Sequence, residues 1–232
     1  MTVLEAVDLT KTFVGGDGGL LTVLDGVSLQ VDQGEMVAIV GASGAGKSTL
    51  LHLLGALDRP TRGRVMIGGL ALDSLDDDAL ASLRNRSVGF VFQFHHLLRE
   101  FSALENVTIP LRLAGWSTPK ATQRATELLQ RVGLGGRMTH RPAALSGGEQ
   151  QRTAVARALA VDPAIVLADE PSGNLDHANA ERLHDLFEEL SRDLEIAMVI
   201  VTHNRSLASR ADRVLLLEDG KLSETNVRVA VP

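Results

Sequence analysis

The sequence contains no cysteine and no tyrosine, and only one of its 232 residues is tryptophan. The lack of cysteine excludes disulfides, thiolate nucleophiles and cysteine-bound zinc, and it is typical of proteins in a reducing compartment. Aromatic residues make up 3% of the chain, which argues against the base-stacking platforms of proteins that bind single-stranded nucleic acid. Without cysteine, any metal site must use carboxylate, hydroxyl or imidazole groups.

The sequence also lacks an apolar run long enough to cross a membrane as a helix, which takes about 20 residues. Its apolar runs, such as 164–168 and 197–201, have the length of strands. The first ten residues include Glu5 and Asp8 and no basic segment followed by an apolar stretch. We therefore expect no secretory signal, and the default location is the cytosol.

Positive charge is scarce as well, with a formal net charge of −6 and an isoelectric point of about 5.6. A broad electrostatic grip on nucleic acid normally needs clustered lysine and arginine, so any phosphate binding must be local. What the chain does have is 44% hydrophobic residues, which is the composition of an ordinary globular domain with a sizeable core.

Short apolar runs alternate with helical patterns, which is typical of an α/β domain with a largely parallel sheet. We expect buried strands at 36–40, 88–92, 164–168 and 197–201, and a helix at 47–57. Residues 3–31 differ, because two or three consecutive strands there are separated by a glycine-rich turn at 15–19. Such strands pair antiparallel and would form a flap beside the main sheet. The tail 212–231 returns to strands.

The segment 94–161 has helical patterns without strands, with helices expected at 118–132 and 148–160. A further helix is expected at 178–194, and its apolar stripe of Leu183, Leu186, Phe187 and Leu190 predicts core packing. We see neither an internal repeat nor an interdomain linker, so the whole chain, 1–232, is predicted to be one domain. Its nucleotide-binding core with the β flap would comprise 1–93 and 161–232, with a helical subdomain at 94–160 inserted between them.

A phosphate-binding motif follows the first buried strand. The run Gly41-Ala42-Ser43-Gly44-Ala45-Gly46-Lys47-Ser48 fits G-x-x-x-x-G-K-[ST] and opens a helix, which is the context that the motif requires. Its glycines let backbone N–H groups point at phosphate oxygens, and the helix N-terminus adds a favourable dipole. Lys47 would neutralise β- and γ-phosphate charge and the Ser48 hydroxyl would ligate Mg²⁺. A plain glycine-rich turn is the alternative.

Two acidic residues, Asp169 and Glu170, end the apolar run 165–168. Carboxylates next to a core strand are costly unless they have partners or a chemical role. Asp169 would hold Mg²⁺, commonly through water, and Glu170 would polarise the attacking water. A strand that simply emerges into solvent would also explain the pair.

Between these two motifs lies Leu145-Ser146-Gly147-Gly148-Glu149-Gln150-Gln151-Arg152. Its serine and two glycines at a helix start would form a second anion cradle, because the free N–H groups there need acceptors. The string resembles the signature sequence of ATP-binding cassette (ABC) ATPases, and it stands where that family has it. The resemblance covers essentially the whole chain. It implies a P-loop NTPase fold with a RecA-like mixed-sheet core, an N-terminal antiparallel β flap and an inserted helical subdomain.

The resemblance extends to shorter motifs. It identifies Gln93 as the Q-loop glutamine, 172–176 as the D-loop and His203 as the switch histidine, and it implies catalytic roles for Glu170, His203 and Gln93. It implies Mg²⁺ binding by Ser48, Gln93 and Asp169. The residues that it implies for ATP binding are Phe13, which would stack on adenine or belong to the core, and Gly41, Ala42, Ser43, Gly44, Ala45, Gly46, Lys47, Ser48, Thr49, Ser146, Gly147, Gly148, Glu149 and Asp176.

In this family two cassettes bind head to tail, with each ATP between the phosphate loop of one subunit and the signature of the other. The resemblance therefore implies a homodimer that closes on two ATP molecules and reopens after hydrolysis. The Q-loop and helical subdomain would pass that motion to integral membrane subunits, contacted through 93–98. It implies a peripheral location on the cytoplasmic face of a bacterial inner membrane.

Segments 93–98, 101–107, 140–142 and 168–176 resemble those of ATP-binding subunits in lipoprotein-releasing (Lol) systems. Such a subunit would power extraction of lipoproteins from the inner membrane and their handover to a periplasmic carrier. Close relatives that drive macrolide export or act at cell division remain alternatives. The pair His95-His96 is not expected to bind metal, because adjacent residues of an extended segment point to opposite sides; we expect it to contact the partner.

Two other classes share part of this pattern. Soluble ABC ATPases act in DNA repair or on ribosomes, but they usually carry long coiled coils or paired cassettes, and this acidic chain has neither. A small P-loop kinase would share 41–48 without needing Ser146-Gly147-Gly148 or His203. The run Asp76-Asp77-Asp78 predicts only a solvated helix start, which the helix dipole favours.

Overall fold

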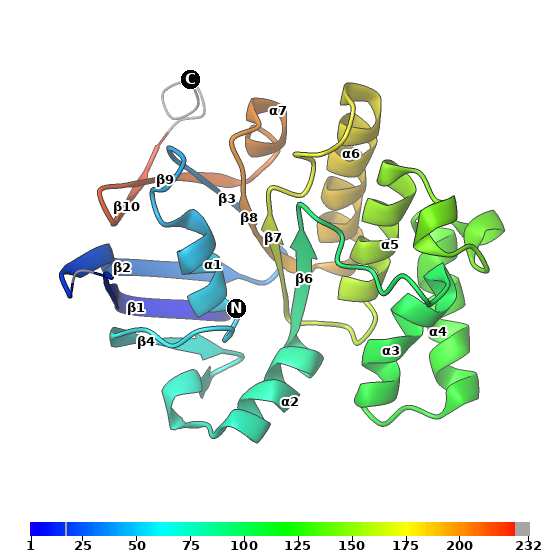
Figure 1. Cartoon of the computed structure of the whole chain (residues 1–232), viewed down its shortest axis with the longest axis horizontal. Coiled ribbons are helices and arrows are strands. Elements are labelled where there is room, and N and C mark those ends of the chain that lie inside the picture. The colour runs from blue at the N-terminus through cyan, green and yellow to red at the C-terminus, as the bar shows by residue number, and fades with distance from the viewer. Residues whose placement is uncertain (17, 226–232) are drawn as a thin grey trace.

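The computed structural model describes residues 1–16 and 18–225 of the chain. These residues form two β-sheets and a layer of helices (Figure 1). The larger sheet has the strand order β10-β9-β3-β8-β7-β6 and is parallel except for the β9–β10 pair. Its strands are β3 (Met36–Val40), β6 (Val88–Phe92), β7 (Ile165–Asp169), β8 (Ala197–Val201), β9 (Arg213–Glu218) and β10 (Lys221–Glu224).

The smaller sheet is antiparallel in the order β2-β1-β4-β5. It consists of β1 (Thr2–Val14), β2 (Leu20–Asp32), β4 (Arg62–Ile67) and β5 (Leu70–Ala71). The antiparallel pairing of β1 with β2 confirms the flap expected for 3–31. Residue 17 of the expected turn lies outside the described residues.

Seven α-helices occur in the described ranges: α1 (Lys47–Leu54), α2 (Asp77–Ser87), α3 (Ala103–Leu113), α4 (Thr118–Arg131), α5 (Gly147–Ala158), α6 (His177–Leu194) and α7 (Arg205–Ala208). Short 3-10 turns cover Leu72–Ser74, Gly135–Arg137 and Pro142–Ala144. Several helices begin at a side chain that accepts a first-turn N–H, as at Asp76, Ser102, Ser146 and Asp176. These caps satisfy donors that have no partner inside the helix.

Two hydrophobic cores cover the two faces of the parallel sheet, because successive strand residues point to opposite sides. Ile165 and Leu167 of β7 join the core shared with α1 and the antiparallel sheet. Val166 and Ala168 of the same strand join the core built with α3, α4, α5 and α6. A strand buried on both faces must be apolar throughout, which is why these strands were predictable from the sequence.

Several boundaries differ from those expected. The helix expected at 47–57 ends at Leu54 with Gly55 as its C-cap, because Ala56 is left-handed with a φ of 57° and cannot continue a right-handed helix. A Cβ added to Gly55 would lie 2.2 Å from the Phe90 ring. The strand expected at 164–168 is shifted by one residue to Ile165–Asp169. The short strands β4 and β5 were not predicted. In the tail, β9 and β10 confirm the return to strands, whereas 226–231 lie outside the described residues.

The apolar stripe of the helix expected at 178–194 is confirmed as core, since Leu183, Leu186, Phe187 and Leu190 of α6 are buried. Helices α3, α4 and α5 fall within the segment 94–160, and the subdomain boundaries stay a prediction. Among the described residues, none of the helices combines the length and the hydropathy needed to traverse a bilayer.

Candidate functional site

The register of the parallel sheet brings four loops to one edge. Phe92 lies opposite Asp169, Asp169 opposite Val201, and Val201 opposite Ile39. Parallel strands end at the same edge, so the segments after β3, β6, β7 and β8 emerge as neighbours. These four segments carry the phosphate motif, Gln93, the two carboxylates and His203, which the sequence analysis singled out separately.

The phosphate motif forms the loop between β3 and the start of α1. Gly46 is the N-cap residue of α1 with a φ of 98°, and an added Cβ would lie 2.8 Å from Cγ1 of Val23 on the flap. No side chain caps this helix, so its first N–H groups face outward for an anion. Ser43, Gly44 and Ser48 are exposed around that opening, and Ala42 borders it. Ala45 and Thr49 of the motif are half-buried.

Lys47 lies folded over the loop that precedes it. Its Nζ donates to the carbonyl oxygens of Gly41 and Ala42, each at 2.9 Å. The ammonium group is thereby held above the mouth of the loop by neutral acceptors. An anion there would be the stronger partner, because it adds ion-pair attraction to the charge-assisted hydrogen bonds that the carbonyls already accept from Lys47.

Glu170 and His203 are joined directly. The Nδ1 atom of His203 lies 2.7 Å from Oε1 of Glu170, and its backbone N–H donates to the same oxygen at 3.1 Å. The Thr202 hydroxyl donates to Oε2 of Glu170 at 3.2 Å. Glu170 itself has a φ of 45°, a strained conformation for a residue with a Cβ and one that is enriched at functional sites. The two sequence motifs thus form one unit, and Thr202 is a member that the sequence analysis missed.

Gln93 leaves β6 and packs against the D-loop. Its Nε2 donates to Oδ1 of Asn174 at 3.1 Å, and Nδ2 of Asn174 donates to the Gln93 carbonyl at 3.1 Å. An added Cβ on Gly173 would lie 2.9 Å from Nε2 of Gln93. The glycine is therefore needed for this close approach, and the Gln93 side chain is held against the D-loop.

The start of α5 carries the signature sequence. Ser146 accepts from the Glu149 N–H at 3.3 Å, and Glu149 accepts from the Ser146 N–H at 2.8 Å, which is a capping box. That backbone hydrogen bond holds the pKa of Glu149 below its usual value. Gly147 and Gly148 form the first helical turn without side chains in the way. Glycine leaves the backbone N–H groups of this turn open to an anion.

Asn179 links the signature to the D-loop. An added Cβ on Gly148 would lie 2.6 Å from Oδ1 of Asn179, and the Asp176 carboxylate accepts from the N–H and Nδ2 of Asn179 at 2.9 and 2.6 Å. The backbone N–H bond lowers the pKa of Asp176. Within one chain, the signature therefore packs beside the D-loop.

Phe13 lies near the tip of the flap. It pairs with Leu21 in the β1–β2 ladder, and its side chain is 41% exposed. Nζ of Lys11 lies 5.1 Å from the ring centroid, a cation–π arrangement, and pairs with Asp58 at 2.7 Å. An exposed aromatic ring on the flap that touches the phosphate loop is suited to stacking on a base.

The oxygen donors suit a magnesium ion. The Ser48 hydroxyl is exposed in the first turn of α1, and the Asp169 carboxylate is half-buried at the end of β7. Hydroxyl and carboxylate oxygens are the hard donors that Mg²⁺ prefers, with waters and phosphate oxygens completing its octahedron. The Gln93 amide is engaged with Asn174. Within the described ranges, no group of three or more histidine, aspartate or glutamate side chains could hold a metal by itself.

The loop after Gln93 is folded rather than extended. His96 has a φ of 46°, so the expectation of an extended His95-His96 segment is wrong. The cause is Arg157 of α5, which donates to the carbonyl oxygens of His96 and His95 at 2.8 and 2.9 Å. Burial lowers the pKa of His95. The loop is pinned to the helix that carries the signature, while Phe94 remains 66% exposed.

Asn106 holds the rest of this loop. It is fully buried; its Oδ1 accepts from the Leu98 N–H at 2.8 Å, and its Nδ2 donates to the carbonyls of Leu98, Phe101 and Ser102 at 3.0–3.1 Å. We predict that Asn106→Ala lowers the free energy of unfolding by about 1–3 kcal/mol, because buried loop groups lose their partners. Urea unfolding followed by circular dichroism measures this change.

Thr126→Ala on α4 is the control, because the Thr126 hydroxyl bonds only its own helix, to the Thr122 carbonyl. It should change the free energy of unfolding by no more than about 0.5 kcal/mol. Equal losses in the two variants would contradict the role given to Asn106.

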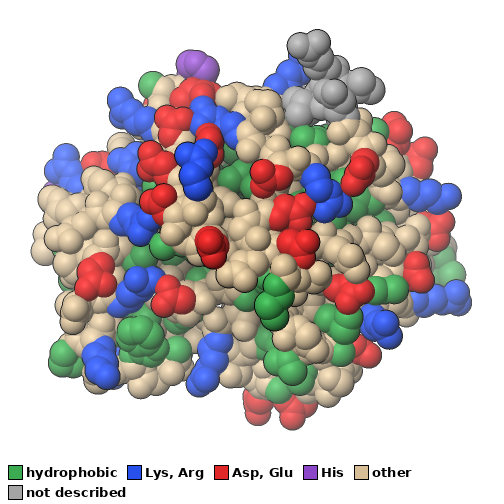
Figure 2. Space-filling model, turned by 180° about the vertical axis from the view of Figure 1, so that it is seen from behind, with side chains coloured by type: hydrophobic (Ala, Val, Ile, Leu, Met, Phe, Trp, Pro, Cys, Tyr) green, Lys and Arg blue, Asp and Glu red, His purple; other side chains and the backbone are tan. Residues whose placement is uncertain are grey.

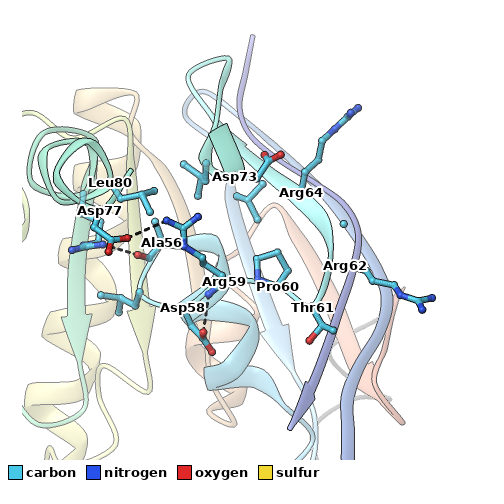
Figure 3. A pocket seen from close by; sticks show the side chains of 15 residues that line it. Ala56, Asp58, Arg59, Pro60, Thr61, Arg62, Arg64, Asp73, Asp77 and Leu80 are labelled. Carbon is cyan, nitrogen blue, oxygen red and sulfur yellow. Dashed lines mark hydrogen bonds and ion pairs between the residues drawn. The ribbon is translucent and has the colours of Figure 1, made fainter. Parts of the chain in front are cut away.

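A cavity of about 350 Å³ lies elsewhere, between β4, α2 and the segment after α1 (Figure 3). Arg59 and Asp77 on its wall pair at 3.1 Å, and Arg84 donates to the Ala56 carbonyl at 2.8 Å. Arg62 and Arg64 point away from it (Figure 3). Arg59, Asp77 and Arg84 are thus paired within the protein, and we assign the cavity no part in the chemistry.

The comparisons with known proteins agree with this geometry. A family model described as "ABC transporter" matches residues 24–173. The chain is 53% identical over 221 residues to the "Lipoprotein-releasing system ATP-binding protein LolD" of Geobacter metallireducens, covering 95% of this chain and 98% of the relative. It is 55% identical over 223 residues to the protein of the same name in Xanthomonas campestris, covering 96% and 92%.

A solved structure titled "Dimeric structure of a post-hydrolysis state of the ATP-binding cassette MJ0796 bound to ADP and Pi" is 39% identical. It covers 97% of this chain and 99% of its own, with a TM-score of 0.87. These similarities confirm the fold class and the family predicted from the sequence.

Proposed function

The chain belongs to the ABC transporter family and is an ATPase, and from this premise we propose that its ATP hydrolysis powers the release of lipoproteins from a membrane. The observation that carries the chemistry is the convergence of the phosphate loop, the Glu170–His203 pair and Gln93 at one edge of the parallel sheet. The observation that carries the substrate is the similarity to lipoprotein-releasing subunits over nearly the whole chain.

ATP would bind with its phosphates in the phosphate loop. The N–H groups of the loop and of the first turn of α1 would hold the phosphate oxygens, and Lys47 would exchange two neutral carbonyl acceptors for the β- and γ-phosphates. Phe13 would stack on the adenine. Mg²⁺, held by Ser48, Asp169 and Gln93, would neutralise charge that develops on the phosphates.

Glu170 would act on the attacking water. Its carboxylate can only accept hydrogen bonds, and its two oxygens already face donors from Thr202 and His203. The attacking water would donate to one of these oxygens, and His203, whose side chain is 71% exposed, is the donor that could move aside to admit it. The switch histidine would turn from Glu170 towards the γ-phosphate as the water enters, and Gln93 would contact the same water.

The ATP-binding site would be completed by a second copy of the chain. The Cα positions of Gly147 and Gly148 pack towards Leu175 and Asn179 of their own chain. Among the described residues, no side chain other than that of Ser146 caps an N–H of their turn, and the similar structure MJ0796 is dimeric. We propose a homodimer in which Ser146, Gly147, Gly148 and Glu149 of one chain meet the γ-phosphate bound by the other. Asp176 would lie at the same junction.

Ser146→Arg tests this arrangement. The arginine would fill the space of the phosphate, so we predict normal ATP binding by one chain and loss of the ATP-dependent dimer. Size-exclusion chromatography with light scattering, in a background that blocks hydrolysis, measures the dimer. Ser43→Arg, a matched change in the phosphate loop, should instead weaken nucleotide binding itself. An ATP-dependent dimer of Ser146→Arg equal to that of the parent would contradict the trans role.

The membrane subunits would dock beside the loop 93–98. A groove of about 360 Å³ opens there between α2, β6, α3 and α5, and its wall includes Leu57, Phe90, Ile109 and Leu113. Phe94, Leu98 and Phe101 nearby are 40–66% exposed. Exposed apolar side chains around a groove suit an amphipathic helix of a partner. The chain would then lie peripherally on the cytoplasmic face of the inner membrane.

The experiment that tests the pathway is recovery of a tagged Glu170→Gln chain with ATP from detergent-solubilised membranes. Mass spectrometry should identify membrane subunits of a lipoprotein-releasing system. Partners from macrolide export or cell division would overturn the pathway and leave the ATP chemistry intact. The wild-type chain with ADP is the control and should recover the same subunits, since docking would not need the closed dimer.

Recovery of ribosomes or DNA-associated proteins would overturn the transporter assignment. The surface argues against that result on at least one face, where Figure 2 shows basic and acidic side chains interspersed rather than gathered into a basic field. Nucleic-acid partners require such a field.

A further inference from the structure

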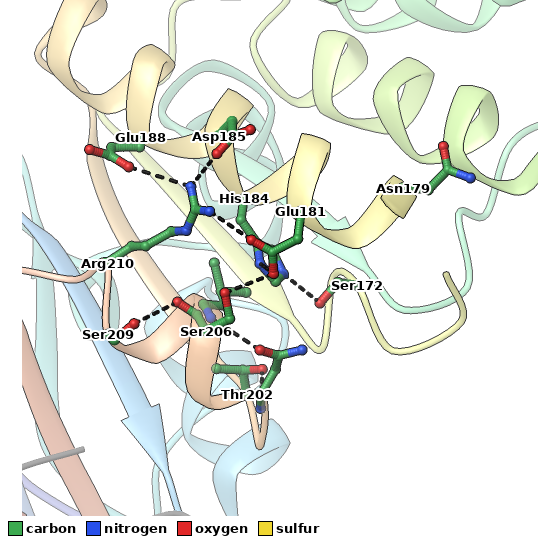
Figure 4. A network of polar contacts seen from close by, with 12 residues as sticks. Ser172, Asn179, Glu181, His184, Asp185, Glu188, Thr202, Ser206, Ser209 and Arg210 are labelled. Carbon is green, nitrogen blue, oxygen red and sulfur yellow. Dashed lines mark hydrogen bonds and ion pairs between the residues drawn. The ribbon is translucent and has the colours of Figure 1, made fainter. Parts of the chain in front are cut away.

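A histidine of α6 is among the buried polar residues to which the proposed chemistry gives no role. His184 of α6 is fully buried, and its Nε2 lies 3.0 Å from Oγ of Ser172. Ser172 is itself 6% exposed and stands two residues after Glu170 in the D-loop. Figure 4 shows the ring of His184 between Ser172 and Glu181. A buried hydrogen bond thus connects α6 to the D-loop.

The same histidine faces the helix that follows His203. Its Nδ1 lies 3.4 Å from Oε1 of Glu181, which is within ion-pair distance but too poorly aligned for a regular hydrogen bond. That carboxylate oxygen accepts from the Ser206 hydroxyl at 2.8 Å, and the other accepts from Arg210 at 2.8 Å (Figure 4). Arg210 also bonds Asp185. The carboxylates of α6 therefore hold α7 through Ser206 and the segment after it through Arg210.

This series of contacts is connected to Glu170 at both of its ends. Helix α7 is capped by Asn204, directly after His203, and the Asn204 N–H donates to the Thr202 hydroxyl at 3.0 Å. The Thr202 hydroxyl donates in turn to Glu170. From the other side, Ser172 is connected to Glu170 through Pro171 alone. The contacts form a closed ring that has the proposed base at one point and His184 at the opposite one.

The protonation of His184 follows from its surroundings. Burial lowers the pKa of the imidazole, and the carboxylates of Glu181 and Asp185 oppose that effect less strongly while Arg210 adds to it. A neutral imidazole has one donor and one acceptor nitrogen. Because the Glu181 carboxylate can only accept, a proton on Nδ1 is favoured. Nε2 then accepts the hydroxyl proton of Ser172 and fixes its rotamer.

We infer that His184 is a positioning residue for ATP hydrolysis, which holds Ser172 and the D-loop so that Glu170 keeps its geometry relative to Thr202 and His203. The inference rests on the proposed role of Glu170. His184 does not touch the substrate. It acts through its hydrogen bond with Ser172 on one side, and on the other through Glu181, which accepts hydrogen bonds from Ser206 of α7 and from Arg210.

The test compares His184→Met with His184→Gln in the purified full-length chain. Methionine fills a similar volume without a strong hydrogen bond, whereas the glutamine amide can offer an acceptor or a donor near the position of Nε2. We expect His184→Met to lower kcat for ATP about 3- to 10-fold with KM unchanged, the effect of losing one hydrogen bond in the transition state. His184→Gln should restore most of kcat. Ser172→Ala should reproduce the loss and add little to His184→Met.

Ser191→Ala is the matched control. Ser191 is a buried polar residue of the same helix, and its hydroxyl donates to the carbonyls of Gly34 and Ile196, away from the ring. It should lower the melting temperature and leave kcat unchanged. If His184→Met fails to fold, the kcat values of Ser172→Ala and His184→Gln still test the inference, which predicts a loss in the first variant and near-parental kcat in the second.

An unchanged kcat in His184→Met or Ser172→Ala, or equal losses in His184→Met and His184→Gln, would overturn the inference. Glu170→Gln, assayed in parallel, separates this failure from failure of the proposed function. An active Glu170→Gln variant contradicts the role of Glu170 itself. An inactive Glu170→Gln variant beside a fully active His184→Met variant contradicts only the role of His184.

Discussion

Glu170→Gln is expected to stop ATP hydrolysis while ATP binding is kept. The amide preserves the size of the side chain, but it cannot take a proton from the attacking water, and removal of a general base typically costs a factor of about 10²–10⁴. Phosphate release measured at saturating ATP gives this factor. Because binding persists without turnover, the variant should also accumulate an ATP-bound dimer, which light scattering detects.

Glu189→Gln is the control for that result, since Glu189 lies on α6 away from the sheet edge. It should hydrolyse ATP at the parental rate. Turnover of Glu170→Gln at more than about a tenth of the parental kcat would rule Glu170 out as the main base.

Lys47→Ala is expected to weaken ATP binding about 10- to 100-fold. The ammonium group is held at the mouth of the phosphate loop by the carbonyls of Gly41 and Ala42. A hydrogen bond to a charged group contributes about 1.5–3 kcal/mol, which corresponds to that change in the dissociation constant. Titration with a fluorescent ATP analogue measures it.

Lys120→Ala removes an exposed lysine from α4 and should leave the dissociation constant unchanged. The two lysine variants change the net charge equally, so they separate a local contact from a general electrostatic effect. Parental nucleotide affinity in Lys47→Ala would contradict the assignment of the phosphate loop.

The strands and their order along the chain were largely predictable because a strand buried on both faces must be continuously apolar, as 36–40 and 197–201 are. The phosphate loop was predictable because its glycines and Lys47 stand at fixed spacing after such a strand. The short strands β4 and β5 were not, because their six and two residues carry no apolar periodicity of their own. They are defined by tertiary pairing, β4 with β1 and β5 with β4.

The contacts between motifs could not be predicted from spacing. The sequence gives Glu170 and His203 as separate candidates, and only the parallel register of β7 and β8 joins them at 2.7 Å. The left-handed His96 follows from Arg157, which is 61 residues away along the chain. His184 shares a helix with a clear apolar stripe, but the sequence does not reveal that Ser172 lies opposite it. Such partners depend on tertiary packing, which local patterns do not encode.

The measurement that tests the central claim most directly is release of a lipoprotein from vesicles. The chain would be reconstituted with the membrane subunits that it recovers, in vesicles that contain a tagged lipoprotein, and release to a soluble carrier would be followed after addition of ATP. We predict ATP-dependent release with the wild-type chain and none with Glu170→Gln at equal ATP occupancy. Wild-type vesicles that hydrolyse ATP and release no more lipoprotein than Glu170→Gln vesicles would contradict the account.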